Sequence, residues 1–162
     1  MSAWSNSMLG RLKSFPRQRR GAAAIEFALF LPMFLIVLVG VIEYGRVLAQ
    51  TNAIEKGMRA GAMIAARSDF PLTDAQTERI FNIVRTGNIE GTPPYLAPGW
   101  AETGASVTIE TDLFNSTGVV NLPVFRIEAT VPYDPLLPGL MDSLGFGELL
   151  ITTAHEQGRV GY

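Results

Sequence analysis

Residues 19–46 read RRGAAAIEFALFLPMFLIVLVGVIEYGR, and this stretch decides how the 162-residue chain is organised. No residue from Phe27 to Ile42 is charged, and extension back to Ala22 gives 21 residues that only Glu26 interrupts. A helix of that length rises roughly 32 Å at about 1.5 Å per residue, which matches a hydrocarbon core about 30 Å thick. The stretch therefore predicts one helix that crosses a membrane once, with Pro32 as a point where the helix is weakened.

The distribution of charge around this helix predicts its orientation. Five bases and no acid precede Gly21, whereas the rest of the chain carries fifteen acids and eight bases. The positive-inside rule then places the N-terminus in the cytoplasm and the bulk of the chain in the periplasm, on the far side of the inner membrane. A basic N-terminal segment followed by an acidic remainder gives no reason to expect nucleic-acid binding. The five bases are Arg11, Lys13, Arg17, Arg19 and Arg20.

The residue types that carry catalysis or bind metals are scarce. The chain has no cysteine, which excludes structural disulfides, thiolate-bound zinc and thiol catalysis. His155 is the only histidine, and a lone histidine does not make a catalytic triad or a metal site. We therefore expect no cofactor, no metal and no enzymatic activity. Four acids, which lack the spacing of a calcium loop, are read as solvated side chains: Asp112, Asp134, Asp142 and Glu148.

A recognisable motif lies at the start of the membrane helix. A basic leader with Arg17, Arg19 and Arg20 ends at Gly21, and four small or apolar residues then lead to Glu26 and Phe27. The run resembles a type IV prepilin processing site. The resemblance implies that a prepilin peptidase, an inner-membrane aspartic protease, cuts after Gly21. Ala22 would become the new N-terminus, and Glu26 and Phe27 would serve in recognition and assembly.

The carboxylate of Glu26 needs an explanation, because an acid in an apolar helix costs about 2.5–3.5 kcal/mol on insertion scales. Cleavage would free a positive α-amino group on Ala22, and in a filament Glu26 of one subunit could pair with that amine on its neighbour. The alternative is that Glu26 is hydrated near the lipid headgroups. The glycine, the basic leader and the following Phe27 together favour the pairing.

Two further stretches extend the resemblance. Gly40–Arg46 and Val131–Leu140 are similar to the TadE-like family, minor pseudopilins of the tight-adherence (Tad/Flp, type IVb) pilus. The resemblance is close over residues 19–67 and weaker over 125–156, and it implies a role in pilus assembly and adherence. The major Flp pilin has a similar N-terminus but lacks a head of this size. The implied partners are the prepilin peptidase, other minor pseudopilins, the major Flp pilin, the Tad inner-membrane assembly platform and membrane lipid.

Two alternatives remain open at this point. The chain could be a membrane-anchored periplasmic interaction module that never enters a filament, although a mere anchor has no use for Glu26. A secretory signal peptide could instead be removed after Ala49, but the apolar stretch is long for that purpose, and Glu43 and Arg46 separate it from the cleavage position.

Beyond the membrane the helix is expected to continue to about Arg67. One stripe of this extension is poor in bulky groups, and Gly57 and Gly61 stand four residues apart. Small residues allow close approach of another element, so the stripe either packs on the chain's own head or forms a seam with another subunit. In the first case Ile54, Met58 and Met63 should cover the sheet. The stripe consists of Val47, Thr51, Ile54, Met58, Gly61 and Ala65.

The rest of the chain predicts a small α+β head. Thr73–Gln76 forms a capping box that should start a helix over 74–86, with Gly87 as its stop. A Pro- and Gly-rich loop follows, with Tyr95 and Trp100 as its aromatic anchors. Alternating residues then predict strands near 107–111, 125–131 and 149–153. The expected organisation is a basic leader (1–21), a transmembrane helix with its exported extension (22–67) and a periplasmic, pilin-like head with three or four antiparallel strands (68–162).

Overall fold

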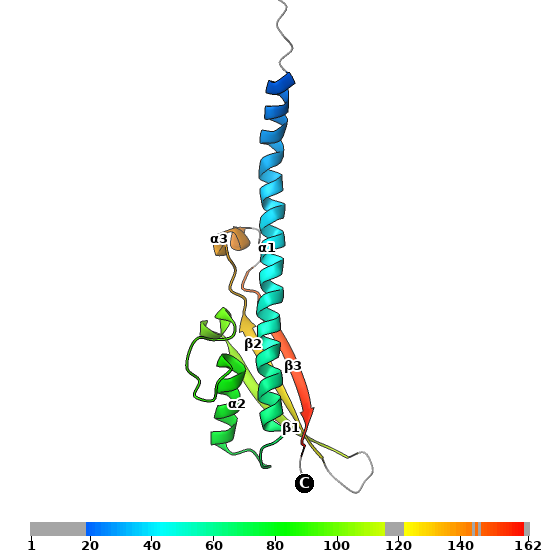
Figure 1. The fold of residues 1–162 in the computed structure, drawn as a ribbon, viewed down its shortest axis with the longest axis vertical. Coiled ribbons are helices and arrows are strands. Elements are labelled where there is room, and N and C mark those ends of the chain that lie inside the picture. Colours follow the sequence, from blue (N-terminus) through cyan, green and yellow to red (C-terminus); the bar gives the residue numbers. More distant parts are fainter. Residues whose placement is uncertain (1–18, 116–121, 144, 146, 161–162) are drawn as a thin grey trace, which may run out of the picture. The chain divides into compact units, whose positions relative to one another are not determined.

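The computed structural model describes residues 19–115, 122–143, 145 and 147–160 (Figure 1). The chain divides into two compact units, Met1–Gly40 and Val41–Tyr162. The predicted α+β class is confirmed. The elements in order are α1 (Arg19–Ala65), α2 (Asp74–Thr86), the short 3-10 helix η1 (Pro98–Ala101), β1 (Ser106–Phe114), β2 (Leu122–Pro132), α3 (Pro138–Ser143) and β3 (Leu150–Gly158).

The first unit consists of the part of α1 up to Gly40, as far as the structure describes it. Its side chains from Gly21 onward are exposed, with only Val39 partly covered. Among the described residues α1 is the one helix that is long and apolar enough to cross a membrane, judged by length and composition. Pro32 lies inside α1 without interrupting the helix.

The second unit begins with the remainder of α1, which buries one face in the head. Ile54 and Met58 are almost completely buried there, as the sequence predicts. The prediction for Met63 is wrong, because its side chain is 52% exposed and Ala62 is buried in its place. The physical reason is close packing: where α1 meets α2, small residues face inward and the bulky side chain is left outside.

Two glycines show how closely α1 and α2 approach. A Cβ atom added to Gly57 would lie 2.2 Å from the carbonyl oxygen of Val84, and one added to Gly61 would lie 2.6 Å from Cγ2 of the same valine. Both distances are far below van der Waals contact. The small residues of the stripe therefore serve a contact within the chain, where α2 packs directly on α1.

The helix α2 has the predicted bounds and the predicted caps. The Thr73 hydroxyl accepts a hydrogen bond from the Gln76 backbone N–H, and the Gln76 side chain accepts one from the Thr73 N–H. Gly87 ends the helix in the left-handed conformation (φ 77°) and donates to the Ile83 carbonyl. This reciprocal capping satisfies backbone groups that the helix itself leaves unpaired.

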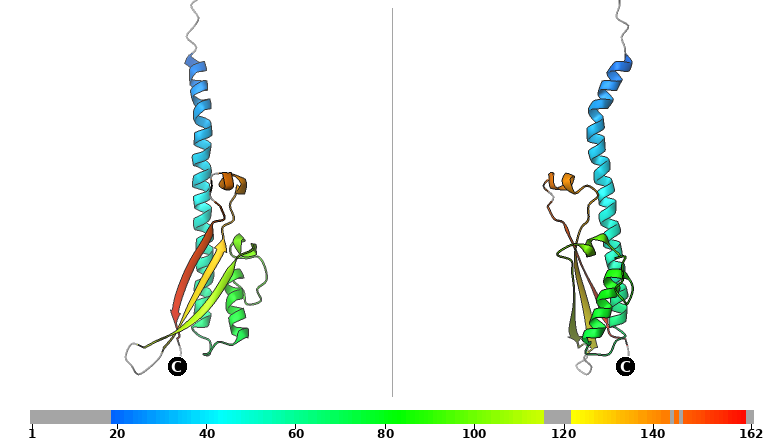
Figure 2. Two further views of the ribbon diagram at one scale, coloured as in Figure 1. Left: turned by 180° about the vertical axis from the view of Figure 1, so that it is seen from behind. Right: turned by 90° about the vertical axis from the view of Figure 1, so that its left-hand side faces the viewer.

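The three described strands form an antiparallel sheet in the order β1-β2-β3, with Ile127 opposite Ile109 on one side and His155 on the other. Helices α1 and α2 cover the same face of this sheet (Figure 2). The inward side chains of β2 are completely buried, whereas Arg126 on the other face forms ion pairs with Glu128 and Glu156. The inward set of β2 is Phe125, Ile127, Ala129 and Val131.

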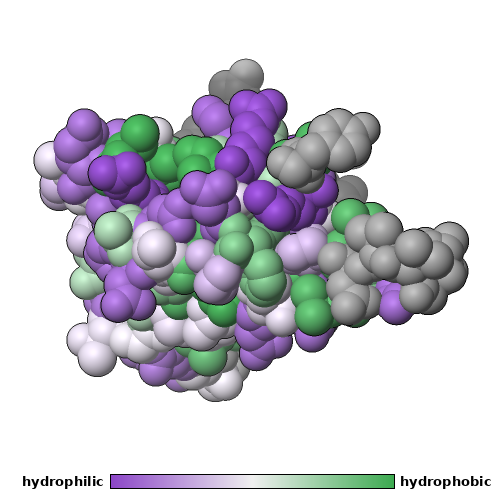
Figure 3. Space-filling view, turned by 90° about the horizontal axis from the view of Figure 1, so that it is seen from below, coloured by the Kyte–Doolittle hydropathy of each residue, from purple (hydrophilic) through white to green (hydrophobic). Residues whose placement is uncertain are grey.

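The two aromatic residues of the loop before the sheet differ in burial. Trp100, in η1, is 6% exposed and joins the hydrophobic core, whereas Tyr95 is 41% exposed. Only Trp100 is therefore a core anchor. At the β1–β2 end of the head, Leu113, Phe114 and Leu122 are exposed. The view of the molecule from below shows hydrophobic and hydrophilic side chains interspersed (Figure 3).

Candidate functional site

The residues of the predicted processing site lie on the first unit. Gly21 and Ala22 are in the first described turn of α1, and Glu26 and Phe27 follow on the same helix with exposed side chains. Ala22 and Glu26 are four residues apart and so share one face of the helix. No hydrogen bond or ion pair joins Glu26 to any residue that the structure describes. Arg17 lies outside the described residues, and of Arg19 and Arg20 only the helical backbone is described, so the processing site stays a prediction.

The second unit contains a carboxylate in a different environment. Glu43 directly follows the uncharged stretch and is only 6% exposed. Its Oε1 atom accepts hydrogen bonds from the backbone N–H groups of Leu136 (2.9 Å) and Leu137 (3.1 Å). Its Oε2 atom accepts a hydrogen bond from the Tyr133 hydroxyl. All three hydrogen-bond donors to the buried Glu43 carboxylate thus come from one short segment just after β2, as a buried polar group requires.

Two more side chains of α1 hold the same segment. The Arg46 guanidinium donates to the carbonyl oxygen of Asp134 (3.0 Å) and forms an ion pair with its carboxylate (3.4 Å). The Gln50 amide bonds that residue twice, because Nε2 donates to its carbonyl (2.9 Å) and Oε1 accepts from its N–H (3.3 Å). We call Glu43, Arg46, Gln50 and the segment Tyr133–Leu137 the polar clamp.

The spacing of the three helical residues explains why they can act together. Positions 43, 46 and 50 are separated by three and four residues, so they lie on one face of an α-helix. The same face continues to Ile54 and Met58, which are buried against the sheet. The inward face of α1 is therefore polar where it meets an irregular backbone segment and apolar where it meets the sheet.

The electrostatics of the clamp follow from burial and from these hydrogen bonds. Burial raises the pKa of Tyr133 to about 12, and its bond to Glu43 and the charge there add to the rise. For Glu43, which lies outside the membrane stretch, burial opposes ionisation, but the bonds from Tyr133, Leu137 and Leu136 and the charge of Arg46 outweigh it. Its pKa is lowered below 4.5. The pair therefore consists of an ionised carboxylate and a neutral phenol.

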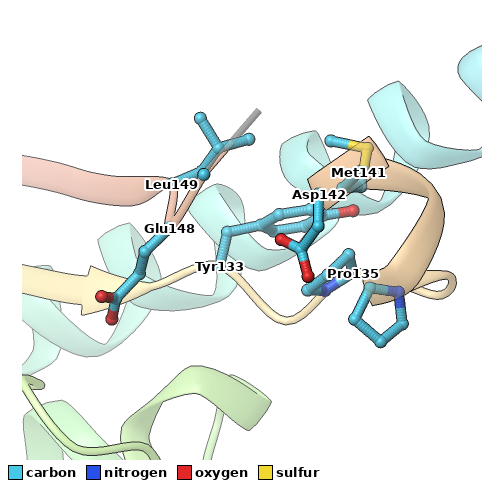
Figure 4. Close-up of a pocket in the computed structure, with 8 residues that line it drawn as sticks. Tyr133, Pro135, Met141, Asp142, Glu148 and Leu149 are labelled. Atoms are coloured by element: carbon cyan, nitrogen blue, oxygen red, sulfur yellow. The ribbon is translucent and has the colours of Figure 1, made fainter. Parts of the chain in front are cut away.

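A small cavity lies beside the clamp. Its volume is about 160 Å³, which is below the roughly 300–1,000 Å³ typical of small-molecule sites. In Figure 4 the Tyr133 ring lies between Met141 and Asp142 of α3 and the Glu148–Leu149 segment before β3. The cavity has room for a side chain rather than a cofactor. Its other lining residues are Pro135, Pro138 and Gly147.

Among the described residues no three His, Asp or Glu side chains come close enough together to hold a metal ion. His155 lies within β3 opposite Ile127, and Thr153, on the same side of the strand, lines with it a polar groove that also includes Glu55 and Arg59 of α1.

The sequence does not predict the clamp, although two of its distinctive segments contain most of the clamp residues. Gly40–Arg46 and Val131–Leu140 each resemble one family, but the resemblance does not say that they touch. One feature could have linked them: Glu43 is an acid directly after an apolar stretch, and such a residue needs donors nearby. The Tyr133 hydroxyl and two N–H groups beyond Pro135 were available donors.

Comparison with known proteins was made at three levels. Neither the curated proteins nor the solved structures include a match to the chain. The model of the family described as "TadE-like protein" matches residues 21–63, which covers α1 from Gly21 through Met63. The resemblance drawn from the sequence is thereby confirmed over that segment, and the family to which residues 21–63 of this chain correspond is the TadE-like family.

Proposed function

We propose that this protein is a minor pseudopilin of a Tad (Flp, type IVb) pilus, processed by a prepilin peptidase and required for pilus assembly and adherence. The observation that carries the proposal is the TadE-like match over residues 21–63, which indicates association with a Tad pilus. It falls on the one described helix with the length and composition of a membrane span. The proposed role is structural rather than enzymatic.

Processing would occur between Gly21 and Ala22. This bond lies in the first described turn of α1. Gly21 has no heavy atom within 4 Å of the position a Cβ would take. A side chain at this position would therefore obstruct the peptidase without disturbing the fold of the described chain.

The freed α-amine of Ala22 would supply the partner for Glu26. In a filament the carboxylate of one subunit would pair with the amine of the next, which would offset the cost of an acid in an apolar surrounding and fix the axial spacing between subunits. Glu26 is suited to a partner outside its own chain because its side chain is exposed.

The head would provide specific contacts, and the clamp would hold it in register with α1. Because Glu43, Arg46 and Gln50 bind the backbone of Tyr133–Leu137, the second half of α1 and the sheet form one compact unit. We place the N-terminus in the cytoplasm and the head in the periplasm. The proposed partners are the prepilin peptidase, other minor pseudopilins, the major Flp pilin and the inner-membrane assembly platform.

The test is mass spectrometry of the mature N-terminus in a host that has the matching peptidase. The wild-type protein should begin at Ala22, and Gly21→Leu should remain uncut. Gly40→Leu is the matched control, because a Cβ at Gly40 also meets nothing within 4 Å and the position is distant in sequence from the cut. A mature form that begins at Gln50, or recovery of full-length protein only, would contradict the proposal.

A further inference from the structure

The segment Pro135–Met141, which begins inside the clamp and continues into α3, is uncharged and apolar. Leu136 and Leu137 are 51% and 41% exposed. Contiguous exposed apolar surface on a protein marks a contact with another protein or with a membrane. Asp134 and Asp142 bracket the segment and mark where polar surroundings begin again.

The clamp fixes the position of these leucines along α1. Their backbone N–H groups bind Oε1 of Glu43 at 2.9 and 3.1 Å, so they lie beside the turn of α1 that carries Glu43, the residue after Ile42. Ile42 and Val41 belong to the same compact unit and are 44% and 64% exposed. The two leucines therefore extend the apolar surface of α1 at the point where its uncharged stretch ends.

An interfacial aromatic lies at the same level. Tyr44, next to Glu43, is 66% exposed, and tyrosine is enriched where a helix leaves the hydrocarbon core. Within the second unit α3 lies at the opposite end from the β1–β2 hairpin (Figure 1). The leucines, Tyr44 and Ile42 are thus gathered at the end of the head where α1 enters it.

We propose that Leu136 and Leu137 insert into the lipid bilayer beside α1 and form a second, shallow membrane contact of the head. The occupant of this surface is lipid because the leucines lie beside the turn of α1 that follows Val41 and Ile42, the last residues of the proposed span, and because the segment Pro135–Met141 is itself uncharged. Shallow insertion at the boundary of headgroups and acyl chains, about 5–10 Å deep, is usual for such apolar segments. This inference rests on the proposed span of α1, but it does not depend on which side the head lies or on entry into a filament.

This second contact would fix the orientation of the head relative to the membrane. A single helix leaves a head free to tilt and rotate about the membrane normal, whereas a second contact restricts both motions. The clamp would make this possible, since it joins the leucines to α1 through backbone bonds rather than through their side chains.

The absence of cysteine from the sequence permits a direct test. Single cysteines at Leu136, Leu137, Val37 and Leu113 would each carry a nitroxide spin label, in the full chain reconstituted in phosphatidylethanolamine–phosphatidylglycerol vesicles. Collision with oxygen reports lipid, and collision with a water-soluble nickel chelate reports water. Replacement of either leucine keeps the backbone bonds to Glu43, so the clamp is retained.

The Val37 label reports on the span, and the Leu113 label, at an exposed site on β1 (56%), reports on water. Labels at Leu136 and Leu137 should lose most of the nickel collisions seen at Leu113 and gain oxygen collisions towards the level at Val37. If Val37 reports lipid while both leucine labels report water, the inference is overturned and the span stands. Protection of the leucine labels from both reagents would overturn it in favour of a protein contact. If the Val37 label reports water, α1 does not span the membrane, and both the proposed function and the membrane contact of the leucines are contradicted.

Discussion

Glu26 and Glu43 are the two carboxylates of α1 that flank its uncharged stretch, and their surroundings differ. Glu43 is 6% exposed and receives hydrogen bonds from Tyr133, Leu136 and Leu137 of its own chain. Glu26 is exposed, and no donor to it lies among the described residues. The difference teaches that one helix can carry two acids for separate purposes: Glu43 acts within the fold, and we propose that Glu26 acts between subunits.

The largest effect on the fold is expected from Glu43→Leu. The substitution leaves the Tyr133 hydroxyl, two backbone N–H groups and the Arg46 guanidinium without the carboxylate they contact. Removal of one partner from such a buried network costs about 3–5 kcal/mol. Chemical denaturation of the detergent-solubilised chain, followed by tryptophan fluorescence, would measure it.

Glu55→Leu is the matched control for that experiment. Glu55 lies on the same helix and forms an exposed ion pair with Arg59 (2.9 Å), and exposed pairs contribute about 0–1 kcal/mol. Equal losses of unfolding free energy for the two variants would show that the clamp has no special role in stability.

The pH dependence of stability should show the contribution of the Tyr133 hydroxyl to the clamp. Its pKa is raised from 10.0 to about 12, so the stabilisation by the neutral hydroxyl is complete below pH 10 and is lost as the pH rises through about 12. A shift of that size corresponds to roughly 2–3 kcal/mol. The free-energy difference between wild type and Tyr133→Phe should therefore be constant at neutral pH and shrink above pH 10.

The control for this titration is Tyr95→Phe, because Tyr95 is 41% exposed and lies outside the clamp. On the acid side the lowered pKa of Glu43 predicts that its stabilisation is present above pH 4.5 and is lost as the pH falls through the lowered value. A difference between wild type and Tyr133→Phe that stays constant up to pH 12 would count against the buried phenol–carboxylate pair.

A smaller effect is expected where α1 packs on α2 without polar groups. Gly57→Ala would place a methyl group 2.2 Å from the Val84 carbonyl oxygen, and backbone does not yield easily, so we expect a loss of about 1–3 kcal/mol. Gly45→Ala on the same helix meets nothing within 4 Å and should be neutral or stabilising by up to about 1 kcal/mol. Equal thermal stability of the two variants would mean that this contact is looser than the structure has it.

The sequence predicted those parts of the fold that depend on local patterns. The capping box at Thr73–Gln76 and the stop at Gly87 define α2, and the alternation around Phe125–Val131 defines the central strand. The prediction for Met63 is wrong because the close approach of α1 and α2 at Gly57 and Gly61 leaves room only for small side chains.

The site was less predictable because its contacts are distant in sequence. Glu43 and Tyr133 are 90 residues apart, and neither periodicity nor capping relates them. The Gly21 processing site and Glu26 were proposed from a motif alone, and their partners lie outside the chain, so the fold of one chain cannot test them. The clamp also depends on the sheet, because β2 ends at Pro132 and so sets where Tyr133–Leu137 begins.

The smallest effect on the fold, and the most direct test of the division between the two carboxylates, is expected from Glu26→Leu. Its free energy of unfolding should stay within about 0.5 kcal/mol of wild type, and processing at Gly21 should persist. The decisive measurement is piliation of the native host at normal levels of the variant protein. We predict that pili are lost, because the α-amine of Ala22 on a neighbouring subunit then has no carboxylate to pair with. Normal piliation at normal protein levels would contradict the assembly role of Glu26.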